Sequence, residues 1–191
     1  MQSIDVSVIQ AIEFAARRHR GQFRKGKRKS AYINHPIQVM SILARHQEHD
    51  SHLLKAAALH DVIEDTAKNP EEIQTLSQTI EWEFGEEVLK VVREVSDDKN
   101  LPFLERKRLQ IVNTPELSQR AKKIKIADKT CNIMDMMDDP PVNWSTDRKL
   151  EYLRWAEQVI EGARGVNPAL EAFFDQTRKK AYRQFTQNNA E

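Results

Sequence analysis

The chain has 191 residues, of which 39% are hydrophobic and 31% charged, a balance typical of a globular domain with its own core. We expect neither a membrane span nor a secretory signal, because apolar runs are short and the first ten residues carry no basic stretch followed by an apolar one. A single cysteine excludes an intramolecular disulfide and favours a reducing, cytoplasmic location, and the net charge of +1 argues against a general attraction to nucleic acid.

Apolar residues recur at three- and four-residue spacings along the chain, which predicts helices throughout. Residues that start or stop helices separate the segments, among them Gly21, Pro36, Gly85 and Pro115. In chain order, the predicted helices cover residues 4–20, 34–43, 52–66, 70–84, 86–95, 105–112, 116–137, 146–164 and 168–185. The sequence contains no repeat or low-complexity linker, so we predict one compact all-α domain over residues 1–191.

A basic segment lies between the first two predicted helices. Residues 17–29 contain eight Arg or Lys side chains in a chain that is almost neutral overall. A local cationic patch of this kind fits a small polyanionic ligand better than a long one. The charge alone does not distinguish such a site from a solvated basic loop, and both interpretations stay open at this point.

The predicted helix 52–66 contains the doublet His60-Asp61 at the end of an apolar run. A charged aspartate there is costly unless a partner compensates it, and a divalent cation would do so. Neighbouring residues on a helix point about 100° apart, so a shared ion needs further ligands from other elements.

Two other residues are suitable partners for the doublet. His35 lies at the start of the second predicted helix, and Asp128 is an isolated carboxylate in an apolar helix. Two imidazoles with two carboxylates favour manganese, iron or zinc over calcium and leave positions for water and substrate. A single buried histidine is more often a packing residue than a ligand, so the prediction depends on all four residues together. The remaining histidines lie in polar surroundings and are predicted to be at the surface: His19, His46, His49 and His52.

The same helix continues with Glu64 and Asp65. Glu64 follows His60 by four residues and therefore shares its face. A carboxylate beside a metal-bound water can act as a general acid or base, although acidic residues also commonly occupy solvated helix ends. We favour the functional interpretation because the pair directly follows the predicted ligands.

Three segments together resemble a known family: HRGQFRKGKRKSAYINHP, AAALHDVIEDT and KIKIADKTCNI. In this order they are similar to the hydrolase domain of RelA/SpoT-type alarmone enzymes. The length and the later segments SDDKNLPFLERKRLQ and RKLEYLRWAEQVIEGARG resemble the stand-alone members, the small alarmone hydrolases that include the metazoan SpoT homologue. The resemblance extends over residues 5–175.

The resemblance implies an all-α HD domain with one manganese ion. Such a domain removes pyrophosphate from the 3′ position of guanosine tetra- or pentaphosphate, the (p)ppGpp alarmones of the stringent response, and leaves GDP or GTP. By motif, the implied metal ligands are His35, His60, Asp61 and Asp128, and the implied catalytic carboxylates are Glu64 and Asp65. The implied substrate contacts are Arg24, Lys25, Lys99, Asn132, Arg148 and Tyr152. Among them, Arg24 would stack on the base and Asn132 would bind the ribose.

One position departs from the family pattern. The long bifunctional enzymes carry an Arg two residues after the Asn, and here that position is Met134. The substrate preference is therefore open between guanosine alarmones, adenosine alarmones and NADPH, which would lose its 2′-phosphate. The other open interpretations are another HD nucleotide phosphatase and a non-catalytic nucleic-acid-binding module, which would show steeply salt-dependent binding and no bound metal. The sequence leaves the oligomeric state open.

Overall fold

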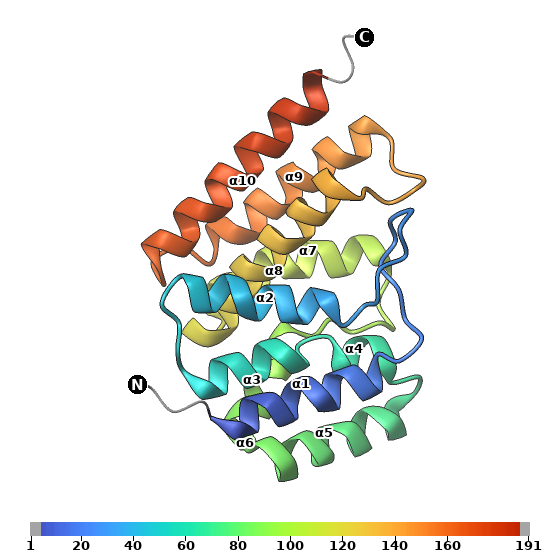
Figure 1. Cartoon of the computed structure of the whole chain (residues 1–191), viewed down its shortest axis with the longest axis vertical. Coiled ribbons are helices and arrows are strands. Elements are labelled where there is room, and N and C mark those ends of the chain that lie inside the picture. The colour runs from blue at the N-terminus through green and yellow to red at the C-terminus, as the bar shows by residue number, and fades with distance from the viewer. Residues whose placement is uncertain (1–4, 188–191) are drawn as a thin grey trace.

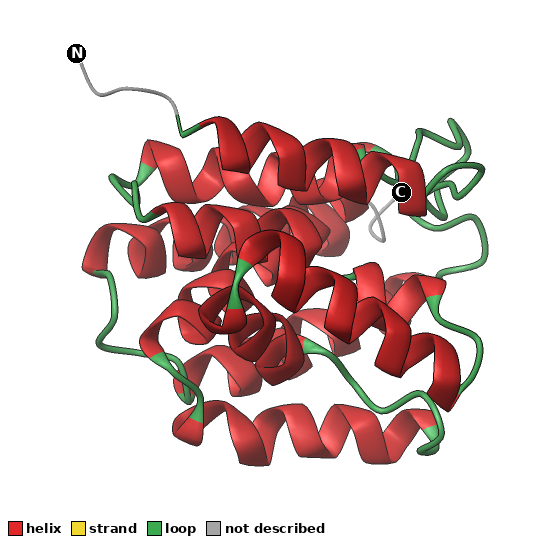
Figure 2. Ribbon diagram, turned by 90° about the horizontal axis from the view of Figure 1, so that it is seen from below, coloured by secondary structure: helices red, strands yellow, loops and turns green. Residues whose placement is uncertain are grey.

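The computed structural model describes residues 5–187, and these residues form helices and loops (Figures 1 and 2). Within that range the only β-type pairings are two isolated bridges, Phe23 with Ala31 and Gly26 with Pro141. The α-helices are α1 (Val6–Arg18), α2 (Asn34–Arg45), α3 (Ser51–Leu59), α4 (Val62–Thr66), α5 (Pro70–Phe84), α6 (Glu86–Val95), α7 (Phe103–Asn113), α8 (Gln119–Asp138), α9 (Thr146–Glu161) and α10 (Pro168–Gln187). A 3₁₀ turn, η1 (Thr114–Glu116), follows α7. The predicted all-α class is confirmed, while Ile4, the predicted start of the first helix, lies outside the described residues.

Local capping residues explain several of the helix starts. The Asp50 side chain accepts the N–H of His52 at the start of α3, and the Asn69 side chain accepts the N–H of Glu72 at the start of α5. Gly85 separates α5 from α6 with φ of 95°, a left-handed conformation that glycine adopts at little cost. These signals are local in sequence, and the predicted bounds 70–84 and 86–95 agree with α5 and α6.

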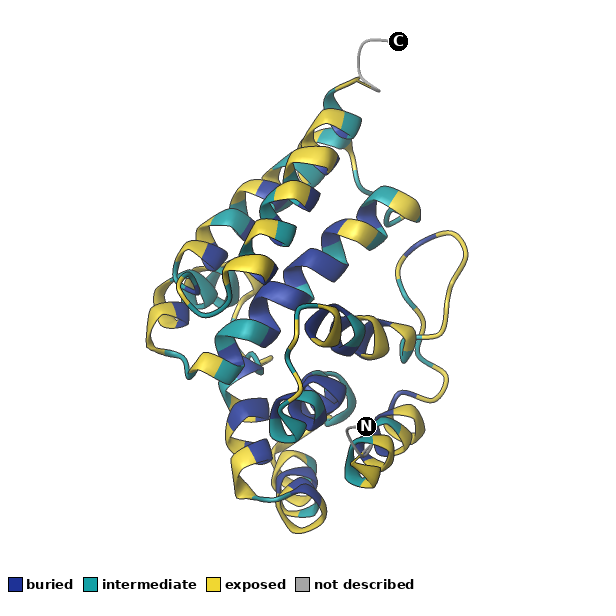
Figure 3. Cartoon of the chain, turned by 60° about the vertical axis from the view of Figure 1, so that its left-hand side comes forward, coloured by how far each residue is buried: buried dark blue, intermediate teal, exposed yellow. Residues whose placement is uncertain are grey.

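Helices α3 and α8 form the centre of the molecule. Helix α3 packs on α1, α2 and α6, while α8 packs on α2, α9 and α10. Most side chains of α3 are buried, and a dark blue stretch of buried residues also follows α8 through the structure (Figure 3). No described helix is long and apolar enough to cross a membrane. Residues on α3 and α8 are therefore held in the most rigid part of the fold.

The predicted helix 52–66 is wrong in one respect, because the chain breaks it into α3 and α4 at the doublet His60-Asp61. Asp61 has φ of −97° and ψ of −5°, and its carbonyl accepts the N–H of Asp65 at 2.8 Å to start α4. The carbonyl of Ala57 accepts a hydrogen bond from the His60 ring at 2.8 Å. The two residues of the doublet thus sit at a turn rather than on a continuous helix.

Residues 19–33, here called the basic loop, connect α1 to α2 and lie against the end of α8. The Asp139 carboxylate accepts the backbone N–H groups of Lys27 and Arg28 at 3.0 and 3.1 Å. A Cβ on Gly26 would overlap the Asp139 side chain, so this close approach requires glycine. The loop is therefore attached to the helix that carries Asp128.

Candidate active site

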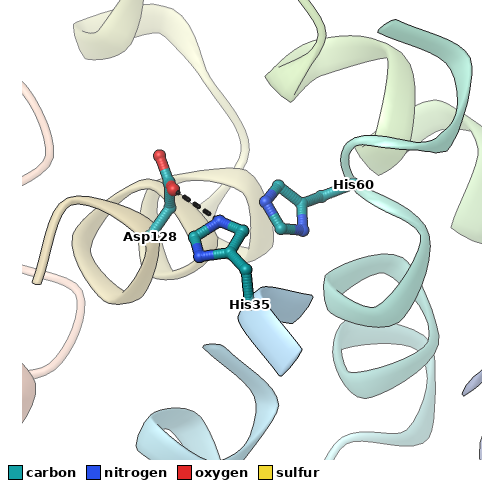
Figure 4. Close-up of side chains that lie close together, drawn as sticks. All are labelled: His35, His60 and Asp128. Atoms are coloured by element: carbon teal, nitrogen blue, oxygen red, sulfur yellow. Dashed lines mark ion pairs between the residues drawn. The ribbon is translucent and has the colours of Figure 1, made fainter. Parts of the chain in front are cut away.

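Four side chains from three parts of the fold meet at one point. His35 lies in the first turn of α2, His60 and Asp61 form the turn between α3 and α4, and Asp128 lies in the middle of α8. The His35 Nε2 atom is 3.2 Å from Asp128 Oδ1 and 3.6 Å from Asp61 Oδ2, and the His60 Nε2 atom is 3.1 Å from Asp61 Oδ2. Figure 4 shows His35 between His60 and Asp128.

This group is suited to a divalent cation. Ligand atoms of His35, His60 and Asp128 all lie within 4.8 Å of one another. Because the Ala57 carbonyl can only accept, Nδ1 of His60 carries a proton, which leaves Nε2 as the nitrogen that a cation would bind. That Nε2 atom is buried and makes no hydrogen bond of favourable angle among the described residues, although Asp61 Oδ2 lies 3.1 Å away. This is expected for a ligand whose other nitrogen is fixed by the backbone.

The charges of these four side chains favour the binding of a cation. Burial opposes the charged forms, yet the pKa of Asp61 is lowered by the His60 imidazole and that of Asp128 by the Lys129 ammonium. Burial also opposes a charge on His60, but Asp61 and then Asp128 raise its pKa to about 9. Two ionised carboxylates in a buried place need compensating positive charge, and a divalent ion bound here would supply it in place of the proton on His60.

The predicted catalytic carboxylates border the same point. Glu64 Oε2 accepts the backbone N–H of Asp97 at 2.9 Å, and Asp65 Oδ1 accepts from Lys99 Nζ at 2.7 Å. Lys99 also lies 3.2 Å from Glu64 Oε1, so one ammonium contacts both carboxylates. Burial raises the pKa of Glu64, which favours a carboxyl that can hold a proton closer to neutral pH.

Arg24 and Asn132 form one connected pair beside Asp128. Arg24 donates to Asn132 Oδ1 at 2.6 Å and to Asp135 Oδ2 at 2.9 Å, and Asn132 Nδ2 donates to Asp128 Oδ1 at 2.5 Å. The structure thus brings two predicted substrate contacts to a predicted metal ligand. Their roles toward base and ribose stay predictions.

The other predicted substrate contacts are more dispersed. Lys25 is exposed in the basic loop. Met134, which stands where the long bifunctional enzymes carry an Arg and was not predicted as a contact, is 39% exposed on α8. Arg148 places its guanidinium 4.8 Å from the ring centre of Trp144. Tyr152 lies between Trp144 and Trp155, with ring centres 5.7 and 5.4 Å apart.

Three residues near the site, two of them buried and Tyr32 half-buried, differ from the expectation from sequence or were absent from it. The Lys129 ammonium donates to Asp128 Oδ2 at 2.9 Å, and the Tyr32 hydroxyl contacts both Asp61 and Asp65. The prediction that His19 is at the surface is wrong: it is 3% exposed, because its ring stacks on Tyr32 at 4.8 Å. Tyr32 precedes His35 by three residues in the YINHP segment, and this proximity was the only sequence signal for it.

Comparisons with known proteins identify the family of this chain. The model of the family described as "HD domain" matches residues 11–153. The chain is 44% identical over 176 residues to guanosine-3′,5′-bis(diphosphate) 3′-pyrophosphohydrolase MESH1 of Xenopus tropicalis, covering 92% of this chain and 94% of that protein. It is also 44% identical over 172 residues to the human protein of the same name, covering 90% of this chain and 92% of the relative.

A solved structure shares the fold. It is described as that of a metazoan orthologue of SpoT that hydrolyses ppGpp and plays a role in starvation responses, and it superposes with a TM-score of 0.86 at 38% identity. The match covers 94% of this chain and 98% of that one. The family predicted from the three motifs is confirmed, and the chain belongs to the HD domain family and, within it, to the MESH1 group of RelA/SpoT-type hydrolases.

Proposed function

We propose that this protein hydrolyses the 3′-pyrophosphate of guanosine 3′,5′-bis(diphosphate) and its pentaphosphate analogue, releasing pyrophosphate and GDP or GTP. The observation that carries the proposal is the junction of α3 and α4, where His60 and Asp61 meet His35 and Asp128 while Glu64 and Asp65 follow within one turn. The MESH1 proteins of Xenopus tropicalis and human carry this activity in their names and align with nearly the whole chain.

The metal ligands in this proposal are His35, His60, Asp61 and Asp128, and the ion is Mn²⁺. Two imidazoles and two carboxylates suit manganese, and the set contains no thiolate that would select zinc. The bound ion would supply Lewis acidity and a water of lowered pKa. Lys129, which donates to Asp128 Oδ2 at 2.9 Å, leaves Oδ1 on the side of His35.

The chain's own carboxylates then perform the proton chemistry. Glu64 and Asp65 orient the attacking water and supply a proton to the 3′ oxygen that leaves. Lys99 holds both carboxylates at 3.2 and 2.7 Å and can turn toward a phosphate, because its side chain is 47% exposed. The raised pKa of Glu64, caused by burial, suits a group that carries a proton during turnover.

The substrate in this proposal lies against the basic loop and α9. The Arg24 guanidinium stacks on the purine, Asn132 binds the ribose, and Lys25, Lys99 and Arg148 face the phosphates. Tyr152 forms part of the aromatic wall next to Arg148, between Trp144 and Trp155. Stacking by Arg24 accepts guanine or adenine, so adenosine alarmones are the second candidate substrate, and NADPH is the third.

A product assay tests the proposal directly. Purified protein is incubated with guanosine alarmone, adenosine alarmone and NADPH, each with Mn²⁺ and then with excess chelator. We expect pyrophosphate and GDP from the guanosine alarmone, highest turnover for that substrate, and loss of turnover on chelation. Turnover that persists in chelator would contradict the mechanism. If NADPH is the only compound turned over, with release of phosphate, it replaces the guanosine alarmone as the proposed substrate.

We further propose that residues 1–191 form a single domain. The buried residues of α1, α3, α8 and α10 belong to one connected core, which leaves no boundary within the described residues 5–187. One cooperative thermal transition, seen equally by far- and near-ultraviolet circular dichroism, is the expected result. Two separated transitions would contradict it.

A further inference from the structure

The Tyr32 hydroxyl touches two carboxylates with different predicted tasks. It lies 2.8 Å from Asp61 Oδ2 and 2.7 Å from Asp65 Oδ2. A phenol has one proton, so it can donate a full hydrogen bond to only one of these carboxylates at a time. The structure therefore places a single donor between a proposed metal ligand and a proposed catalytic carboxylate.

The oxygen of Asp61 that Tyr32 contacts is also the one nearest the two imidazoles. Asp61 Oδ2 is 3.1 Å from His60 Nε2 and 3.6 Å from His35 Nε2, so this oxygen faces the proposed cation. An oxygen that binds a cation becomes a poorer hydrogen-bond acceptor, because the cation withdraws its electron density. Asp65 Oδ2 then becomes the better acceptor for the Tyr32 proton.

The ring of Tyr32 is held so that the hydroxyl stays between the two carboxylates. His19 stacks on one side at 4.8 Å with an interplanar angle of 28°, and the Arg24 guanidinium lies 5.6 Å from the ring centre. His19 is fixed by Gln22 at 2.7 Å, and Gln22 donates to the backbone carbonyl of Asp65 at 2.9 Å. Rotation of the hydroxyl proton alone is enough to change its acceptor.

Asp65 has few other contacts that fix its side chain. Its Oδ1 atom accepts from Lys99 at 2.7 Å, but the Lys99 side chain is 47% exposed and this ion pair is screened by water. The other carboxylate oxygen, Asp65 Oδ2, accepts from the Tyr32 hydroxyl, which is neutral and more buried than the Lys99 ammonium. The orientation of Asp65 therefore depends on whether Tyr32 donates to it.

We propose that Tyr32 is a positioning residue whose hydrogen bond moves from Asp61 to Asp65 when a cation binds Asp61, so that metal loading orients the catalytic carboxylate. The inference rests on the proposed function and names a regulation of the same site. Tyr32 acts through Asp65 and does not itself contact substrate. The hydroxyl makes one hydrogen bond in the metal-free protein and one in the metal-loaded protein. Its removal therefore destabilises both states.

The substitution Tyr32→Phe keeps the ring and removes only the hydroxyl. We expect the Mn²⁺ dissociation constant, measured by titration calorimetry, to change less than about threefold, since both states lose one hydrogen bond of similar strength. At saturating Mn²⁺ we expect kcat for the guanosine alarmone to fall about tenfold and KM to stay the same, because only the orientation of Asp65 is lost. Tyr182→Phe, at a tyrosine that is 50% exposed on α10, is the matched control and should change neither value.

If Tyr32 donated only to Asp61 in both states, its removal would change metal affinity rather than the orientation of Asp65. Loss of such a ligand-orienting hydrogen bond weakens metal affinity by about 10- to 100-fold, and that result for Tyr32→Phe would overturn the proposal. Unchanged kcat would overturn it as well.

A second measurement does not depend on activity. In the wild type, Asp65→Asn provides a poorer acceptor for Tyr32 in the loaded state, so the Mn²⁺ dissociation constant should rise by about two- to tenfold. In the Tyr32→Phe variant the same substitution should have a clearly smaller effect, since the coupled donor is gone. Equal effects in both backgrounds would overturn the coupling. If no nucleotide is turned over by the wild type, the proposed function fails while this cycle still tests Tyr32.

Discussion

The proposed metal ligands and the lysines of the neighbouring basic loop differ strongly in solvent exposure. His35 and His60 are 2% and 5% exposed and are carried by the central helices, whereas Lys25 is exposed on a loop with no regular structure. The ligands are fixed by packing, and the loop is fixed by a few contacts such as those of Asp139. The difference indicates that the core fixes the cation site, whereas the exposed lysines of the loop attract and bind the nucleotide.

The largest expected effect follows from removal of a ligand. His60→Ala or Asp61→Ala should abolish bound Mn²⁺ and lower kcat/KM at least about a thousandfold, because the ion contributes several kcal/mol to the reaction. Metal content by elemental analysis and alarmone turnover are the measurements. Full activity in a variant that binds no metal would show that the reaction does not need the cation site that the core fixes.

Removal of a catalytic carboxylate should separate chemistry from metal binding. Glu64→Gln retains the shape of the side chain and the acceptor for the Asp97 N–H, so we expect normal folding and metal content. The value of kcat should fall about a hundredfold, the lower range for loss of a general acid or base. If metal is lost together with activity, Glu64 belongs to the metal ligands, and its assignment as a separate catalytic carboxylate is wrong.

A charge on the basic loop should affect binding rather than chemistry. Lys25→Gln is expected to raise KM by about three- to tenfold, to leave kcat unchanged, and to weaken the dependence of kcat/KM on salt. Lys27→Gln, at another exposed lysine of the same loop, is the matched control. Equal effects at both positions would mean that the loop attracts the substrate without a specific contact.

The smallest expected effect on the chemistry comes from distortion of the loop. A methyl group on Gly26 would overlap Asp139, so Gly26→Ala should destabilise the fold by about 1–3 kcal/mol and lower the melting temperature by several degrees. Metal content and kcat should stay unchanged while KM rises. A loss of bound Mn²⁺ would show that the distortion reaches the ligands through Tyr32 or Arg24 of the same loop.

Most of the fold could be predicted because its signals are local. The caps Asp50 and Asn69 and the breaker Gly85 stand next to the helices they limit, and the predicted bounds at those places agree with the structure. The break at His60-Asp61 could not be predicted, since residues 52–66 contain no Gly or Pro to mark it. It depends on tertiary contacts of the doublet, which sequence periodicity does not contain.

The candidate site shows the same limit. The four proposed ligands were identified because charged residues in apolar helices need compensation, and the structure brings them together. His19 was misjudged because the Tyr32 ring covers it, in a loop where polarity predicts exposure, and Tyr32 itself was passed over. Lys129 was passed over, since a lysine in a helix is usually exposed, and its burial is explained by its contacts with Asp128 and the Trp155 ring.

The central claim is that one divalent ion, held by the four converging side chains, supports the hydrolysis. Asp128→Asn tests it most directly, because it removes the ligand charge with little change in shape and keeps an acceptor for Lys129. Bound Mn²⁺ per chain, alarmone turnover and circular dichroism are measured for the wild type and this variant. We predict one ion and turnover for the wild type, and neither for a folded Asp128→Asn. A folded variant that retains both the ion and turnover would contradict the account.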